Sequence, residues 1–167
     1  MSTQDLLLSG LIEVTVSGTF KTEHVFESSG GNLGSLVIKG GKGEGVFTGS
    51  EGLVLEFKKP SAWKNQYQIH ESNNLIASVQ LPKKIRKAFE IEFDGQVFEL
   101  SPGGSKNRSW TLKNDQGAGV CEILPRGGLK RGAKCEVVNQ IPLRLMVLVY
   151  YLVEKRWKEE AAASADF

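Results

Sequence analysis

The sequence predicts a mainly β protein, in which an antiparallel barrel of about twelve strands encloses one hydrophobic C-terminal helix. Between residues 11 and 138, short apolar–polar alternation is broken about every eight to twelve positions by turn-forming residues. Nine consecutive residues, 145–153, are apolar or aromatic. A helix that is apolar on every side must be surrounded by lipid or by protein. Nine residues cover roughly 14 Å, about half of a hydrocarbon core, so the strands are the better surroundings.

The strand-like segments have one apolar and one polar face, which is typical of antiparallel sheets. Asp94-Gly95 fits a type I′ hairpin turn, because both residues accept positive φ. Closing the sheet around the helix buries the helix and removes unpaired strand edges. The expected strands are residues 11–17, 24–28, 35–39, 45–49, 53–58, 66–71, 75–81, 89–93, 96–100, 109–113, 119–123 and 134–138.

The helix is expected over residues 142–160, because Pro142 suits a first helical turn and the residues after 153 become strongly charged. Arg144 should lie at a mouth of the barrel, since an unpaired buried guanidinium is costly. Chain length favours a single domain over residues 1–167, with strands at about 11–138, the helix at about 142–160 and a short disordered-looking tail at 161–167. We expect a cytosolic protein with no transmembrane segment, since the N-terminus lacks a secretory signal and no stretch reaches about 18 apolar residues.

Three segments resemble the tubby C-terminal-like superfamily, which includes the LURP-one-related proteins and the phospholipid scramblases. YQIHESNNLIASVQ (67–80) resembles one of its strand pairs, AFEIEFDGQVFEL (88–100) its central hairpin and IPLRLMVLVYYLVEKRW (141–157) its terminal helix. The resemblance is best over residues 53–157 and implies a twelve-stranded barrel around a central helix. Its motifs are structural. The tubby phosphoinositide site and the calcium-binding and palmitoylated segments of scramblases have no counterpart here, so no functional residue is carried over.

No catalytic constellation is present in the sequence. His24 and His70 each stand alone on a predicted strand, and we interpret them as surface or half-buried polar residues. Cys121 and Cys135 lack the spacing of a zinc site and are expected to be small buried hydrophobes. We therefore expect a protein that is not an enzyme and that has no metal site and no cofactor.

The basic residues suggest a binding surface. Residues 57–135 carry fourteen Lys or Arg against seven Asp or Glu, and the clusters fall in predicted connections between strands. If alternate connections share one end of the barrel, these clusters converge there. Each Lys or Arg near an anionic lipid surface contributes about 1 kcal/mol. The lipid-headgroup candidates are Lys83, Lys84, Arg86, Lys87, Arg126, Lys130 and Arg131, and further clusters are Lys58, Lys59 and Lys64 beside Trp63, and Lys106 with Arg108.

Three functions remain open at this point. The first is a non-enzymatic module that binds anionic phospholipid headgroups, as a cytoplasmic protein peripheral at the membrane surface. The alternative is a soluble scaffold or protein-interaction domain whose basic loops are incidental. The third is a barrel that holds a small hydrophobic ligand, for which the helix side chains leave little room. Nucleic acid ranks below lipid, because the net charge is only +2 and Trp110 is expected to face the core.

Overall fold

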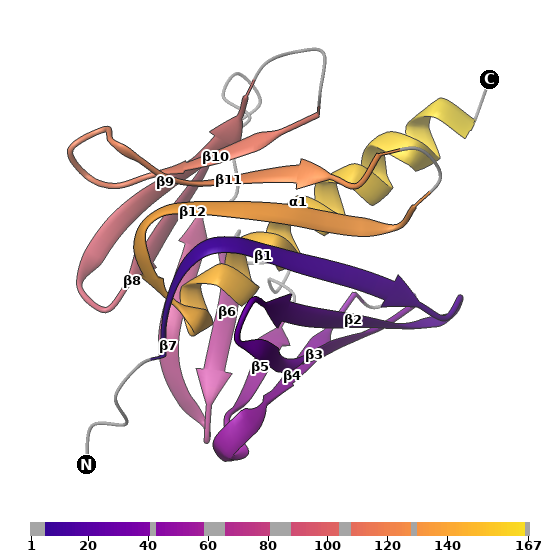
Figure 1. Ribbon diagram of the computed structural model, residues 1–167, viewed down its shortest axis with the longest axis horizontal. Helices are drawn as coiled ribbons and strands as arrows, with labels where there is room; N and C mark the ends of the chain where they lie inside the picture. Colours follow the sequence, from indigo (N-terminus) through magenta and orange to yellow (C-terminus); the bar gives the residue numbers. More distant parts are fainter. Residues whose placement is uncertain are drawn as a thin grey trace.

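The computed structural model describes residues 6–40, 43–58, 66–80, 88–103, 108–127 and 130–165. These residues form a closed antiparallel barrel of twelve strands around a C-terminal helix, as the sequence predicts (Figure 1). Each strand pairs with its neighbours in the chain, and β1 pairs with β12. The strands are β1 (Leu7–Ser17), β2 (Lys21–Ser28), β3 (Gly31–Lys39), β4 (Gly45–Gly49), β5 (Val54–Lys58), β6 (Gln66–Glu71), β7 (Asn74–Gln80), β8 (Phe89–Phe93), β9 (Gln96–Pro102), β10 (Trp110–Lys113), β11 (Gly119–Pro125) and β12 (Gly132–Pro142).

The barrel closes where β1 meets β12, in a register that runs from Leu7 opposite Pro142 to Thr15 opposite Gly132. The register shifts between Leu8 and Gly10, and Gly10 has a φ of 78°. A residue with positive φ at such a bulge bends the strand without ending the pairing. The strands therefore begin at Leu7 and end at Pro142, wider limits than the predicted 11–138.

The β8–β9 hairpin has the predicted turn. Asp94 and Gly95 have φ values of 50° and 73°, and Phe93 pairs with Gln96 across them. Positive φ at both central residues is the requirement of a type I′ turn, whose twist matches that of the strands. Phe89, Ile91 and Phe93 are all buried, as the alternation predicts.

The helix α1 (Leu143–Ala165) occupies the interior of the barrel, and every residue from 143 to 153 is buried. The Tyr150 ring contacts Phe26 at 5.1 Å between centroids, and the Tyr151 ring contacts Phe57 at 4.9 Å. The helix thus fills the space in which a ligand-carrying barrel would hold its ligand.

Both limits of the helix differ from the prediction. Pro142 is the last residue of β12 rather than a helical residue, and Leu143 begins α1 with its N–H donating to Leu6 O at 2.8 Å. The helix was expected to end near residue 160, before a disordered-looking tail at 161–167, but it continues to Ala165, and residues 166 and 167 lie outside the described residues. Alanine has the highest helix propensity, so residues 161–163 extend the helix even without packing.

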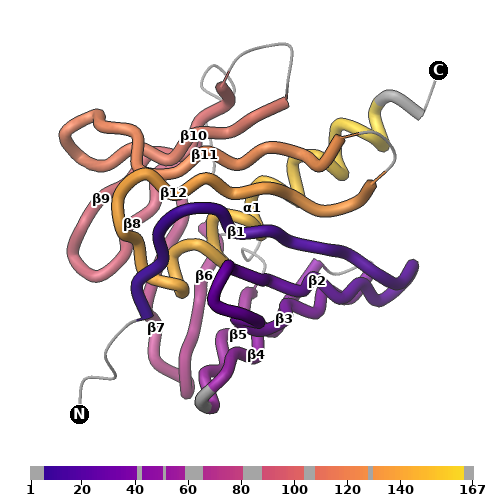
Figure 2. The backbone as a smooth tube through the Cα atoms, viewed as in Figure 1, coloured from indigo at the N-terminus to yellow at the C-terminus, as the bar shows by residue number. Residues whose placement is uncertain are grey.

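The two ends of the barrel carry different connections. In an up-and-down barrel, alternate connections lie at the same end, as the chain trace in Figure 2 shows. We call the end where α1 begins the helix-start end, and the opposite end the helix-exit end. The C-terminal turns of α1 project from the helix-exit end, which is also the end that carries the β1–β2 connection (Figures 1 and 2).

Candidate functional site

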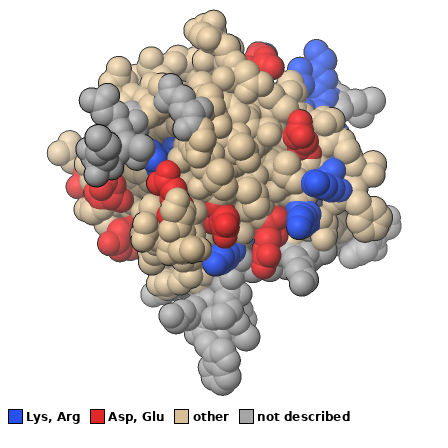
Figure 3. All heavy atoms as spheres, turned by 90° about the horizontal axis from the view of Figure 1, so that it is seen from below, with Lys and Arg blue, Asp and Glu red and all other residues tan. Residues whose placement is uncertain are grey.

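The helix-exit end gathers basic residues from connections that are far apart in the sequence. It holds the β1–β2, β3–β4, β5–β6, β7–β8, β9–β10 and β11–β12 connections, because all of these join strands at the same end of the meander. In Figure 3 most of the visible Lys and Arg side chains lie toward the right, the side of the helix exit in Figure 1. The described basic residues in or beside these connections are Lys21, Lys39, Lys58, Arg108, Arg126, Lys130 and Arg131.

The structure describes three of the seven predicted headgroup candidates. Arg126, Lys130 and Arg131 lie between β11 and β12 at the helix-exit end, where Lys130 and Arg131 are exposed and Arg126 is half-buried. Lys83, Lys84, Arg86 and Lys87 lie outside the described residues. The flanking residues Gln80 and Phe89, which end β7 and begin β8, belong to the helix-exit end.

Arg131 joins two neighbouring connections. Its Nη1 donates to Gly18 O, between β1 and β2, at 2.7 Å. Arg126 Nη1 in turn donates to Arg131 O at 3.3 Å. These contacts hold the guanidinium groups of Arg126 and Arg131 close together on the rim of the barrel at the helix-exit end. Part of each group still faces solvent.

Two lysines face each other beside this rim. Lys21 at the start of β2 is the cross-strand partner of Lys39 at the end of β3, and both side chains are exposed. Like charges at directly opposite positions destabilise a sheet, and a bound anion would relieve that repulsion. Glu23 on β2 and Glu44 between β3 and β4 are exposed carboxylates in the same region. The lysine pair was not predicted, because residues 1–56 carry three Lys or Arg against seven Asp or Glu and only the β2–β3 register brings Lys21 and Lys39 together.

Other cations at this end contribute to the structure. Arg108 O accepts a hydrogen bond from Trp157 Nε1 at 3.0 Å, and the Arg108 guanidinium lies 5.8 Å from the Trp157 ring centroid. Arg108 also pairs with Glu160 at 3.7 Å. These contacts attach the β9–β10 connection to the projecting part of α1.

The cations of α1 are also engaged. Arg156 pairs with Glu159 at 3.2 Å, and Lys158 pairs with Glu154 at 3.6 Å. Lys155 Nζ lies 4.9 Å from the Tyr67 ring centroid. The cations most available to an external anion are therefore those of the connections, and less so those of the helix.

The prediction that His24 is a surface or half-buried residue was wrong, because its side chain is fully buried at 0% exposure. The Thr22 hydroxyl lies 2.8 Å from His24 Nε2, and the Tyr150 hydroxyl lies 2.5 Å from Nδ1. Burial lowers the pKa of His24 to about 3, with smaller contributions from the positive charges of Lys158 and Arg131. A neutral imidazole with both nitrogens engaged connects the barrel wall to the helix. His70 is half-buried, as expected.

Both cysteines are buried, as predicted. Burial raises the pKa of Cys121 to about 12 and that of Cys135 well above the usual value for a thiol. Cys121 Sγ lies 3.8 Å from Met146 Sδ on α1. Thiols in this state are protonated at neutral pH and unreactive, so they act here as small core side chains.

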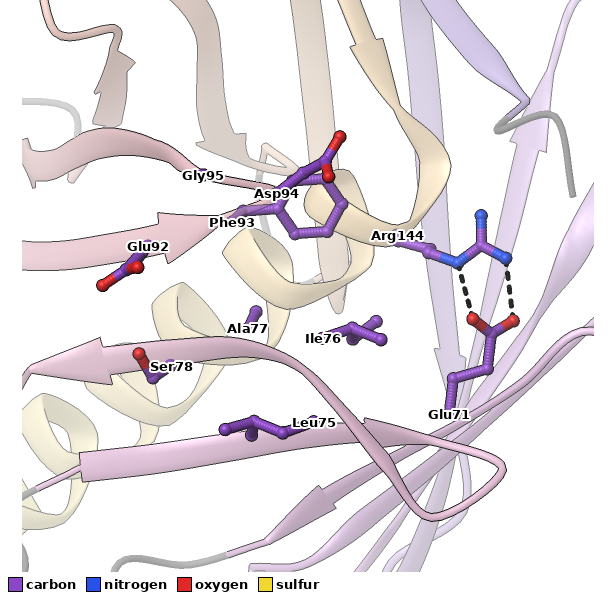
Figure 4. Close-up of a pocket in the computed structure, with 10 residues that line it drawn as sticks. All are labelled: Glu71, Leu75, Ile76, Ala77, Ser78, Glu92, Phe93, Asp94, Gly95 and Arg144. Carbon is purple, nitrogen blue, oxygen red and sulfur yellow. Dashed lines mark hydrogen bonds and ion pairs between the residues drawn. The ribbon is translucent and has the colours of Figure 1, made fainter. Parts of the chain in front are cut away.

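A pocket of about 580 Å³ lies at the helix-start end, between β7 and the β8–β9 hairpin (Figure 4). Arg144 lies at this mouth of the barrel, as predicted, with 9% of its surface exposed. Its Nη2 and Nε donate to Glu71 Oε1 and Oε2 at 2.7 and 3.2 Å. Glu92 and Asp94 also line the pocket, so its charged groups are mainly carboxylates and do not favour an anion.

Within the described ranges, no three His, Cys, Asp or Glu side chains lie close enough together to hold a metal ion. Among the same residues, no helix combines the length and the hydropathy needed to cross a bilayer.

Comparison with known proteins gives no relative. No family model matches the chain, and no significantly similar protein was found among curated proteins or solved structures.

Proposed function

We propose that this protein is a non-enzymatic module that binds anionic phospholipid headgroups at the cytosolic membrane surface through the helix-exit end of its barrel. One observation carries the proposal: the connections that hold the basic clusters all join strands at the same end. We also propose that the chain is a divergent member of the tubby C-terminal-like superfamily. The closed twelve-stranded barrel around a buried helix supports that assignment.

The electrostatic attraction is sufficient for reversible binding. Each Lys or Arg within a Debye length of an anionic surface, about 8 Å at physiological salt, contributes about 1 kcal/mol. The described cations in the connections, apart from Arg108, therefore contribute several kcal/mol before the cost of association. Binding of this kind weakens as salt is added, and it tolerates different anionic headgroups.

The buried histidine and the two cysteines are poorly suited to acid–base or nucleophilic chemistry, which favours a binding role. His24 is neutral and has both nitrogens engaged, and the two thiols are held in their protonated form. None of these groups opens onto the basic rim, since all are buried. The rim offers cationic side chains and backbone, which are suited to holding an anion.

A protein-interaction role, the alternative, is favoured by a different surface. Leu7, Leu11 and Val138 are exposed large hydrophobic residues on the adjacent strands β1 and β12. Exposed apolar groups on neighbouring strands are typical of a surface that contacts another macromolecule. This surface lies on the wall and toward the helix-start end, so the two roles can be tested separately.

The test is co-sedimentation with phosphatidylcholine vesicles, with and without phosphatidylserine or a phosphoinositide, at low and physiological salt. We expect selective, salt-sensitive binding that is lost in the Lys39→Glu/Lys130→Glu variant. The matched control uses single changes: Lys130→Glu should weaken binding, whereas Lys113→Glu changes the net charge equally at the helix-start end and should not. Equal loss in both single variants, or no binding by the unmodified protein under any condition, would contradict the proposal.

A soluble inositol phosphate, added as a competitor, separates two sources of the same chemistry. If the inositol phosphate releases the protein at a concentration far below the sodium chloride concentration that does so, the protein recognises an individual headgroup. Release only in proportion to ionic strength indicates attraction to the charged surface as a whole.

A further inference from the structure

Phe20 is the most exposed large hydrophobic residue that the structure describes, with 87% of its surface accessible. It lies in the connection between β1 and β2, at the helix-exit end. Moving a side chain of this size out of water is among the larger hydrophobic gains that a single exposed residue can make on binding. The position of Phe20 therefore places an unused apolar group among the cations of the proposed binding surface.

The connection that carries Phe20 is fixed from two sides. Gly40 N–H, from the β3–β4 connection, donates to Phe20 O at 2.8 Å, and Arg131 Nη1 donates to Gly18 O at 2.7 Å. Gly18 itself has a φ of 93°, and a Cβ atom there would lie 2.2 Å from Lys21 O. The backbone is thus tied to both neighbouring connections, while the Phe20 ring faces solvent.

Basic residues lie on the elements next to Phe20. Lys21 follows Phe20 directly, Lys39 is the cross-strand partner of Lys21, and Arg131 contacts the same turn through Gly18. The carboxylates of this region include Glu23, Glu44 and, near Arg131, the Glu154 carboxylate of α1. An apolar tip with basic residues around it matches the two layers of a membrane interface, where anionic phosphates lie above the acyl chains.

We propose that Phe20 inserts into the boundary between headgroups and acyl chains of an anionic bilayer, while Lys21, Lys39 and Arg131 contact the headgroup phosphates. This inference rests on the proposed function and specifies how the helix-exit end binds. Burying the Phe20 ring strengthens membrane binding by about 10- to 100-fold over the same surface without it. Unlike the lysine contribution, this contribution is insensitive to salt.

The first measurement compares Phe20→Ser with Val138→Ser in vesicle co-sedimentation. Both remove an exposed apolar side chain, but Val138 lies on the outer wall of β12 with 73% of its surface accessible. We expect Phe20→Ser to weaken binding to anionic vesicles by at least 10-fold at physiological salt, and Val138→Ser to leave it unchanged. Neither position is part of the core, so the variants should fold normally. Equal affinities for Phe20→Ser and the unmodified protein would overturn the inference.

The second measurement reports insertion directly. A polarity-sensitive maleimide dye is attached at Phe20→Cys, with Val138→Cys as the control position; Cys121 and Cys135 are buried and should not be labelled. We expect a blue shift and quenching by nitroxide-labelled lipid only for the dye at position 20.

The two measurements together separate the inference from the function on which it rests. Co-sedimentation without a change in the dye at position 20 overturns insertion and leaves headgroup binding in place. A dye response that is equal with neutral vesicles supports insertion and contradicts the headgroup proposal. The absence of both signals contradicts both.

Discussion

Acid should destabilise this protein through one residue, His24. Its folded-state pKa of about 3 lies below the 6.5 of an ordinary histidine, because burial disfavours the charged form. Between these values the unfolded chain binds a proton that the folded protein does not, so stability is complete above about pH 6.5 and falls as the pH decreases. At pH 5.0, about 1.5 units below the unfolded value, the loss is about 2 kcal/mol at roughly 1.4 kcal/mol per unit.

The assay is urea unfolding, followed by tryptophan fluorescence, at pH values from 7.5 to 5.0. The slope attributable to His24 is isolated by comparing the unmodified protein with His24→Gln, which does not titrate. Burial raises the pKa of Glu154, which acts in the opposite sense, but this contribution is present in both proteins and cancels. The matched control is His70→Gln, which removes the other histidine of the chain and should keep the slope. If His24→Gln retains the full pH dependence, the reasoning is refuted.

Two further predictions test the core. Leu148→Asp places an uncompensated charge at a residue with 1% exposure and should abolish soluble folding, whereas Leu148→Met should cost less than about 1.5 kcal/mol; a cooperative thermal transition in the aspartate variant would contradict the buried helix. Cys121 and Cys135 should resist iodoacetamide in the native protein and react fully in urea, since both thiols are buried and held protonated; rapid alkylation of either under native conditions, read by mass spectrometry, would contradict that assignment.

The strands could be predicted because their alternation follows from local physics. A strand that forms part of a barrel wall alternates between core and solvent, and turns require particular residues, as Asp94-Gly95 illustrates. The first strand was predicted to begin at residue 11, because Ser-Gly is a dipeptide typical of turns. In the structure Gly10 lies at a bulge instead, which only the pairing with β12 makes favourable.

The burial of His24 could not be predicted, because its partner lies far away in the chain. Tyr150 is 126 residues from His24, and the hydrogen bond between them forms only when the helix enters the barrel. The lysine pair of Lys21 and Lys39 is a similar case, because it depends on the β2–β3 register. The sequence predicted that the basic clusters converge only if alternate connections share one end of the barrel. The strand order of the barrel meets that condition.

The meander also separates charge along the barrel axis. Among the described residues, Asp94 and Asp115 lie in connections at the helix-start end, whereas the cations in or beside connections lie mainly at the helix-exit end, together with Glu44. Because the chain reverses direction after every strand, successive connections, such as β1–β2 and β2–β3, lie at opposite ends of the barrel. An anionic surface would therefore attract one end and repel the other. If the helix-exit end binds lipid as proposed, the axis of α1 stands across the membrane surface and its buried start points away from it. Among the described residues, Glu71, Glu92, Asp94 and Asp115 place carboxylates at the helix-start end, which would then face away from the membrane.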